Sequence, residues 1–321
     1  MADPRLVVAL GGNVIGRSGG TGAWSEAVRE VRRSAPAIAR LLRRHWQLCL
    51  THGNGPQVGR LLLQNELARA EVPVLPLDVL VAESQAQIGY LLATELSPAL
   101  RRAGVPRTVL SFPTRMVVAA DDPAFSRPDK PVGPYYSEAQ ARLLRKSRGW
   151  TLLADPARGG YRRVVPSPRP VAWVEARAFR ALLASHAAER ILPVVAGGGG
   201  IPVRDRGGGR YEGVEAVIDK DRSAALVGRA LGAASLVILT DVPSVVVGFR
   251  RPFERPLGEV GPAELRGYLE AGEFGSGTMA PKIEAALDFL AGGGRSVLIT
   301  DPPHLEDGLA GRAGTRIGRS G

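Results

Sequence analysis

Short apolar runs alternate along the chain with longer segments in which apolar residues recur at helical spacing. The runs predict buried strands and cover residues 6–10, 48–51, 108–112, 191–196, 236–239 and 297–300. The longer segments predict helices and cover residues 25–44, 56–70, 78–96, 176–186, 222–231, 262–271 and 283–290. Because strand and helix alternate, we predict an α/β fold with an open, mainly parallel sheet and helices on both faces.

The alternation is interrupted between Pro113 and Pro170. This stretch is dense in proline and arginine, and its apolar runs, at 150–153 and 161–165, are short. Short apolar runs separated by many prolines and arginines do not fit a strand–helix repeat. We therefore predict one domain, residues 1–321, with a small inserted subdomain at residues 114–172. The residues after 300 are expected to form a short polar tail.

The composition indicates a globular protein with a sizeable core, since 45% of the 321 residues are hydrophobic. The apolar run near the start is too short for a signal peptide. No apolar stretch approaches the roughly 20 residues of a membrane span, so we expect no membrane partner. The single cysteine, Cys49, cannot form an internal disulfide, and we expect a reducing, cytoplasmic location.

The formal net charge of +11 raises the question of nucleic-acid binding. The arginines form scattered doublets, such as Arg32-Arg33 and Arg101-Arg102, without interleaved aromatic residues or a basic tail. Several doublets fall on the polar faces of predicted helices, where water solvates them. We therefore expect no nucleic-acid partner and instead a small anionic substrate.

Three predicted strands run into glycine-rich turns that precede helical segments. The turns are Gly11-Gly12-Asn13, Gly53-Asn54-Gly55 and Gly197-Gly198-Gly199-Gly200. Ligands of open α/β sheets lie beyond the carboxyl ends of the strands. Glycine lets the backbone approach a ligand closely, and free N–H groups at the start of a helix attract anions. Three turns of this design indicate a protein that handles phosphate.

Other known motifs are absent or incomplete. A Walker A loop is missing, and the dinucleotide fingerprint at residues 53–59 has its last glycine one residue late, so a nicotinamide enzyme stays a distant alternative. There is no His-Glu-x-x-His motif, cysteine pair or calcium loop, and the metal ligands stay unknown. We interpret His52 as a turn-stabilising residue or a residue at the substrate's edge. No serine sits in a nucleophile elbow.

Lysine is rare, because only four of the 42 basic residues are lysines and 38 are arginines. Lysine offers a compact point charge where arginine offers a planar fork, so the surviving lysines mark places that need a point charge. Phosphoryl transfer needs such charge over the moving oxygens. Lys220 and Lys282 open predicted helices, with Asp221 beside Lys220. Lys130 lies in the insert, and we interpret Lys146 as solvated surface.

The motifs, in this order, resemble those of the carbamate kinase family, a branch of the amino-acid kinase superfamily, over residues 6–317. The first glycine turn is shared by the wider superfamily. Three runs are specific to the branch: His-Gly-Asn-Gly-Pro-Gln-Val-Gly at 52–59, Lys-Pro-Val-Gly-Pro at 130–134 and Val-Ile-Asp-Lys-Asp at 217–221. Further matching runs lie at 76–79, 83–90, 160–168, 197–202, 239–243 and 279–285.

The resemblance implies a three-layer αβα sandwich of amino-acid-kinase type, a protruding subdomain and a homodimer. It implies reversible, Mg-dependent phosphoryl transfer between ATP and carbamate, which gives ADP and carbamoyl phosphate. By motif, the catalytic residues would be Lys130, Lys220, Asp221 and Lys282. The carbamate side would contact Gly11, Gly12, Asn13, Gly53, Asn54, Gly55, Gly198 and Gly199. The nucleotide would contact Lys220, Asp241, Val242, Pro243, Met279 and Lys282.

The sequence departs from the family pattern in a few places. Asp129 replaces the small hydroxyl residue that usually precedes Lys130, Ala280 replaces the usual residue before Pro281, and the loop after Asn13 is rich in glycine. None of these changes removes a predicted catalytic residue. The alternatives are a sister kinase that acts on an amino-acid carboxylate or a nucleotide, and a non-catalytic ligand-binding protein on the same fold. No role follows for Asp219.

Overall fold

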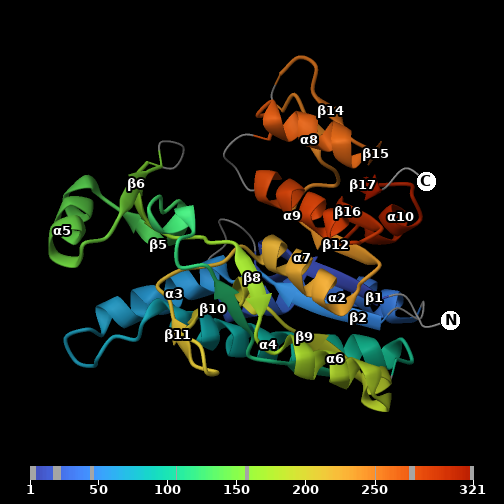
Figure 1. Ribbon diagram of the computed structural model, residues 1–321, viewed down its shortest axis with the longest axis horizontal. Coiled ribbons are helices and arrows are strands. Elements are labelled where there is room, and N and C mark those ends of the chain that lie inside the picture. Colours follow the sequence, from blue (N-terminus) through green and yellow to red (C-terminus); the bar gives the residue numbers. More distant parts are fainter. Residues whose placement is uncertain are drawn as a thin grey trace.

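An eight-stranded sheet lies at the centre of the computed structural model, which describes residues 5–16, 23–43, 47–105, 107–155, 159–249, 251–274 and 279–318 (Figure 1). Its order is β15-β17-β16-β12-β1-β2-β9-β3. Neighbouring strands pair in parallel, except β16 with β17. The strands are β1 (Arg5–Leu10), β2 (Gln47–His52), β3 (Thr108–Ser111), β9 (Ile191–Val194), β12 (Ser235–Leu239), β15 (Glu259–Val260), β16 (Ser296–Thr300) and β17 (Thr315–Gly318).

Both faces of this sheet are buried, which explains why its central strands are apolar at successive positions. Leu6 and Val8 of β1 point into one core cluster, and Val7 and Ala9 point into the other. Helices α2 (Trp24–Arg43) and α4 (Leu77–Arg102) cover the first face. The second face is covered by α6 (Ala176–Ala184), α7 (Lys220–Leu231), α8 (Pro262–Glu270) and α9 (Met279–Ala291).

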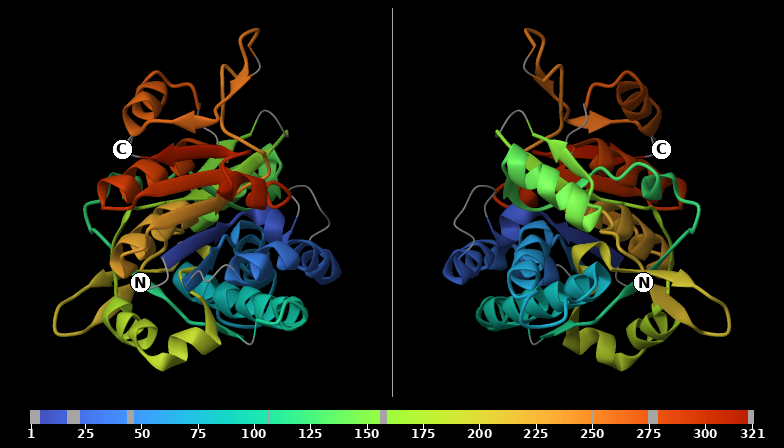
Figure 2. Two further views of the ribbon diagram at one scale, coloured as in Figure 1. Left: turned by 90° about the vertical axis from the view of Figure 1, so that its right-hand side faces the viewer. Right: turned by 90° about the vertical axis from the view of Figure 1, so that its left-hand side faces the viewer.

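Figure 2 shows the central strands between these two helix layers. The predicted fold class, a three-layer αβα sandwich with a mainly parallel open sheet, is therefore confirmed. A helical element begins within three residues of the end of each of β1, β2 and β9: α1 (Gly12–Ile15), α3 (Gly55–Leu67) and the 3₁₀ turn η3 (Gly197–Gly199). The three glycine turns thus lie at the carboxyl edge of one sheet.

The stretch 114–172 forms parts of two smaller sheets. Strands β4 (Arg115–Val118) and β8 (Pro170–Trp173), at its two ends, join a sheet of order β11-β10-β4-β8 with β10 (Ile201–Asp205) and β11 (Tyr211–Gly213). Between them lies a sheet of order β5-β7-β6, formed by β5 (Lys130–Tyr136), β6 (Leu152–Ala154) and β7 (Tyr161–Val165). Together with α5 (Glu138–Arg148), this sheet lies at the left of Figure 1. The division of the chain at 114 and 172 stays a prediction.

The prediction of a polar tail after residue 300 is wrong, because residues 315–318 form β17 inside the main sheet, between β15 and β16. Thr315 is fully buried, and its hydroxyl donates to the Leu257 carbonyl at 2.5 Å and accepts from the Val245 N–H at 2.8 Å. The remaining described elements include a two-stranded sheet of β13 (Val246–Val247) and β14 (Arg255–Pro256). They also include α10 (Leu305–Leu309) and the 3₁₀ turns η1 (Pro123–Phe125) and η2 (His186–Arg190).

Candidate active site

A cavity of about 530 Å³ opens at the carboxyl edge of the main sheet, and we call it the lysine cavity. The first residues of α3 and α7 line it, together with parts of α9, β5 and β7. Its charged side chains are five cations and three carboxylates, so its lining carries a net positive charge that suits an anion. These are Lys130, Arg162, Lys220, Arg222 and Lys282, with Asp129, Asp219 and Asp221.

Two lysines share one buried carboxylate in this cavity. Asp221 is only 1% exposed, and its two oxygens accept hydrogen bonds from the Nζ atoms of Lys220 and, at 3.2 Å, of Lys282. Lys220 is the first residue of α7, whereas Lys282 lies in the first turn of α9. The carboxylate therefore holds two ammonium groups, from segments 61 residues apart, side by side.

Asp219, to which the sequence assigned no role, joins the third lysine to this pair. One of its oxygens caps α7 by accepting the Asp221 N–H at 2.9 Å. The other oxygen accepts from Nζ of Lys130 on β5 at 2.8 Å. Val217 and Ile218 immediately before it are buried, which anchors the cap. The structure thus brings all four predicted catalytic residues together, with Asp219 as the link.

The charges of the cluster shift one another's pKa values. Burial alone would raise the pKa of Asp219, but Lys130, Lys220 and Lys282 hold it well below its usual range. Burial lowers the pKa of Lys220, and Lys282 acts in the same direction. Burial also opposes the charge of Lys282, yet the carboxylates led by Asp221 raise the pKa of that lysine. Asp219 therefore stays ionised, and Lys220 loses its proton more readily than Lys282 does.

The predicted substrate-binding glycines fall into two groups. Gly12, Gly53, Asn54, Gly55 and Gly198 line the lysine cavity. A Cβ on Gly12 or Gly55 would meet nothing within 4 Å, so these two backbone segments leave open space for a ligand. Gly11 and Gly199 instead pack against the protein, where a Cβ would approach the Leu239 and Ile218 carbonyl oxygens. The backbone of Asn13 lies in α1, and its side chain is outside the described structure.

We expect Gly199→Ala to lower the free energy of unfolding by about 3 kcal/mol. Gly199 has φ of +89°, and an added Cβ would lie 2.3 Å from the Ile218 carbonyl oxygen. The left-handed backbone costs roughly 1–2 kcal/mol and the clash roughly 1–3 kcal/mol. Urea denaturation of the purified variant measures the change. Gly208→Ala is the control, because Gly208 also has positive φ, +61°, but open space around it; equal losses in both variants would contradict the packing argument.

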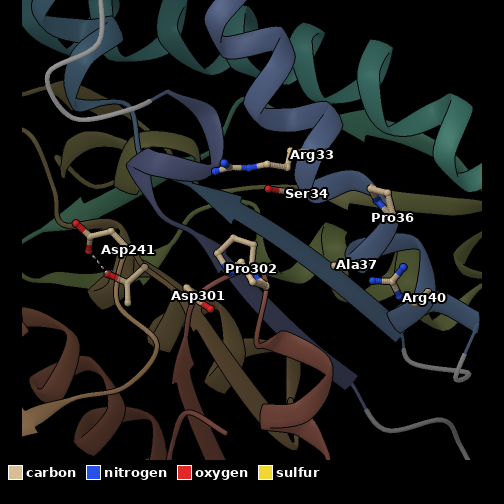
Figure 3. A pocket seen from close by; sticks show the side chains of 10 residues that line it. Arg33, Ser34, Pro36, Ala37, Arg40, Asp241, Asp301 and Pro302 are labelled. Atoms are coloured by element: carbon tan, nitrogen blue, oxygen red, sulfur yellow. Dashed lines mark hydrogen bonds between the residues drawn. The ribbon is translucent and has the colours of Figure 1, made fainter. Parts of the chain in front are cut away.

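The predicted nucleotide residues are divided between two cavities. Lys220 and Lys282 line the lysine cavity, whereas Asp241 lines a separate cavity of about 610 Å³ beside α2, which we call the Arg33 cavity (Figure 3). The negative charge of Asp241 nevertheless helps to raise the pKa of Lys282. Pro243 accepts a hydrogen bond from the Thr300 hydroxyl at 3.1 Å. Val242 and Met279 line neither of these two cavities.

Arg162 is a lining residue of the lysine cavity that the sequence did not single out. It lies on β7, which pairs with β5 so that Val165 faces Lys130. Its guanidinium donates to the Gly133 carbonyl at 3.1 Å, and its Nε is buried without a partner among the described residues. The strand pairing explains its position, because β7 places Arg162 beside the strand that carries Lys130. In the sequence, Arg162 lies within the matching run at 160–168, but that run gave it no role.

His52 and Cys49 take no part in proton or thiol chemistry near neutral pH. Burial lowers the pKa of His52 to about 4, so its imidazole is neutral, and its Nδ1 lies 3.0 Å from the Gly53 carbonyl oxygen. This contact agrees with the interpretation of His52 as a turn-stabilising residue. Burial raises the pKa of the Cys49 thiol to about 12, which leaves it unreactive.

The described residues contain no group of three or more histidine, cysteine or acidic side chains placed to hold a metal ion. Asp219 and Asp221 are both occupied by lysines. The donor set therefore does not fit a metal held by protein ligands alone. A membrane-spanning helix is likewise absent from this part of the chain.

Comparison with known sequences identifies the family. The pattern of the amino acid kinase family matches residues 4–301. The chain belongs to the amino acid kinase family. Within this family, the carbamate kinase of Pyrococcus horikoshii is 39% identical over 315 residues, covering 98% of both chains. The carbamate kinase of Halobacterium salinarum is 44% identical over 316 residues, covering 97% of each. The predicted family is therefore confirmed.

Solved structures of this family have the same fold. The carbamate kinase of Giardia lamblia bound to AMP-PNP superposes with a TM-score of 0.89 at 35% identity, covering 99% of each chain. A protein of Aeropyrum pernix K1 gives a TM-score of 0.91 at 41% identity, covering 98% of this chain and all of that one. A carbamate kinase-like protein of Escherichia coli K12 is 40% identical over 315 residues. The amino acid kinase fold thus extends over nearly the whole chain.

Proposed function

We propose that this amino acid kinase is a carbamate kinase, which transfers a phosphoryl group reversibly between ATP and carbamate. The observation that carries the proposal is the pair of ammonium groups, Lys220 and Lys282, that one buried carboxylate holds in a glycine-lined cavity. Such fixed positive charge stabilises the oxygens of a transferring phosphoryl group. The choice of carbamate as acceptor rests on the similar proteins that carry this name.

The proposed transfer is direct and in line. An oxygen of carbamate attacks the γ-phosphorus of ATP, the bond between that phosphorus and the bridging oxygen of ADP breaks, and carbamoyl phosphate forms. Carbamate is already an anion, so no general base has to remove a proton, which agrees with the neutral and buried state of His52. The rate then depends on orientation and on charge neutralisation by the lysines.

We propose separate roles for the residues around the cavity. Lys220 and Lys282 neutralise the transferring oxygens, Asp221 positions both, and Lys130 reaches in from β5. Of the predicted carbamate contacts, the open backbone at Gly12 and Gly55 leaves room for the acceptor, with Gly53, Asn54 and Gly198 around it. Met279 and the segment 241–243 border the nucleotide. Magnesium enters with the nucleotide phosphates, as is usual for this ion.

The proposal is tested by ATP formation from ADP, magnesium and carbamoyl phosphate with the purified protein. We expect ATP to appear in proportion to enzyme, because the reaction is reversible. Parallel reactions replace carbamoyl phosphate by an acyl phosphate of an amino-acid carboxylate, which a sister kinase would use. A folded protein that makes no ATP from carbamoyl phosphate would overturn the proposal, and ATP from the acyl phosphate alone would favour the sister kinase.

We expect the alkaline limb of the pH profile to lie below the normal lysine range. Burial lowers the pKa of Lys220, so rising pH removes its proton before it would remove that of an ordinary lysine, whose pKa is about 10.4. Activity should therefore be full at neutral pH and fall as pH rises through the lowered pKa. The pH dependence of kcat/KM for ADP reports this free-enzyme pKa. An alkaline limb at or above the ordinary value would contradict the assignment.

We also propose a cytoplasmic homodimer. Strand β3 lies at one edge of the main sheet, and Leu110 on it is 38% exposed. Tyr90 of the adjacent helix α4 is 65% exposed and stacks on Trp24. An open strand edge next to exposed large side chains supports self-association. Sedimentation equilibrium of the purified protein checks the dimer, and a monomer at all concentrations would overturn it.

A further inference from the structure

A second cavity, of about 560 Å³, lies between the three-stranded sheet and the hairpin of β10 and β11, and we call it the arginine cavity. It shares no lining residue with the lysine cavity. Its charged lining consists of three arginines, Arg148, Arg163 and Arg204, against one carboxylate, Glu215. The volume lies within the range of roughly 300–1,000 Å³ typical of small-molecule sites.

Aromatic rings hold two of these arginines in place. The guanidinium of Arg163 lies 4.3 Å from the ring centre of Trp150, and that of Arg204 lies 4.8 Å from the ring centre of Phe125. All four side chains line the arginine cavity. Stacking on a ring orients the planar fork before a ligand arrives, so binding loses less conformational freedom. The cavity is therefore preorganised for an anion.

The acidic partners leave much of this positive charge available. Arg163 donates to Glu215 at 3.3 Å, but the carboxylate of Glu215 is 56% exposed. Arg148 is 3.8 Å from Glu66, which lies outside the cavity lining. Within the cavity lining, the arginines therefore outnumber the carboxylates by three to one.

We propose that the arginine cavity binds an organic phosphate. Three guanidinium groups and one carboxylate leave a net charge of +2 in the lining, which matches a phosphate monoester of charge about −1.5 to −2 at neutral pH. The arginine fork fits phosphate oxygens in pairs. The volume exceeds that of a bare ion, so the rest of the ligand occupies the space beside Trp150 and Phe125.

The site is connected to the lysine cavity through one strand. Successive side chains of a strand point to opposite faces, and on β7 Arg162 lines the lysine cavity while Arg163 lines the arginine cavity. The next strand, β5, carries Lys130 opposite Val165 of β7. An organic phosphate on Arg163 would therefore contact the same strand that borders the proposed active site.

Isothermal titration calorimetry with ribose 5-phosphate tests the proposal. The full chain is first saturated with ADP and magnesium, which occupies the nucleotide site. We expect binding that Arg204→Gln weakens about 10-fold or more, as for loss of a charge-assisted hydrogen bond. Arg148→Gln, at the partly exposed end of α5, should also weaken it. Arg210→Gln is the control, because Arg210 is exposed on the same hairpin and outside the cavity.

Two results would overturn the proposal. One is the absence of heat from ribose 5-phosphate at millimolar concentration with folded protein. The other is binding that is equally strong in the Arg204→Gln, Arg148→Gln and Arg210→Gln variants, because the phosphate would then lie elsewhere. The titration measures binding only, so its outcome is independent of whether the protein makes ATP from carbamoyl phosphate.

Discussion

Replacement of Lys220 by arginine is expected to lower kcat for ATP formation about 100-fold or more, although the positive charge is kept. The Lys220 side chain is only 11% exposed and packs against Gly53. A Cβ added to Gly53 would lie 3.3 Å from the Cδ of Lys220. The planar guanidinium cannot place one compact charge where the ammonium group lies next to Asp221. The point charge over the transferring oxygens is then lost.

The control for this variant is Lys146→Arg, because Lys146 is exposed on α5. Steady-state assays in the direction of ATP formation give kcat for both variants, and circular dichroism shows whether they are folded. We expect Lys146→Arg to be as active as the unchanged protein. A folded Lys220→Arg enzyme that turns over at a near-normal rate would show that the point charge at this position is not required.

The Asp221→Asn variant is expected to lose both activity and stability. Asp221 is 1% exposed and accepts from both Lys220 and Lys282. An amide would leave two buried ammonium groups without their shared carboxylate, and removal of one partner of a buried ion pair costs about 3–5 kcal/mol. Misplaced lysines should also lower kcat about 100- to 1,000-fold. Urea denaturation and steady-state assays measure the two effects.

Asp129→Asn is the matched control for Asp221→Asn. Asp129 lines the same cavity and is exposed, so its carboxylate is solvated and, among the residues that the structure describes, holds no buried partner. We expect its free energy of unfolding to stay unchanged. If Asp221→Asn were as stable and as active as Asp129→Asn, the buried carboxylate would have no part in holding the two lysines.

The sheet could be predicted from sequence because its strands are buried on both faces. A strand such as β1, with Leu6 and Val7 in different core clusters, needs apolar side chains at successive positions, and that pattern is visible directly. Strand β17 was missed for the opposite reason. Thr315 is buried through two hydrogen bonds rather than through apolar contacts, and a single apolar residue, Ile317, remains to mark the strand.

The candidate site was only partly predictable. The scarcity of lysine singled out Lys130, Lys220 and Lys282, and the structure brings them into one cavity. The place of Asp219 could not be predicted, because its hydrogen bond to Lys130 joins positions 89 residues apart. Arg162 was missed because the register of β7 against β5 decides which face it occupies, and no local pattern encodes that register.

The position of β17 has a consequence for the order of folding during synthesis. A chain folds from its N-terminal part as it leaves the ribosome, yet Val245 and Leu257 gain their bonds to Thr315 only after residues 315–318 have been made. Among the described strands, β15 also pairs in the sheet only with β17. Val245 follows the segment 241–243 that we propose borders the nucleotide, so this part of the molecule should acquire its final form last. A ribosome-bound chain ending at residue 300 should therefore lack the final form of this part.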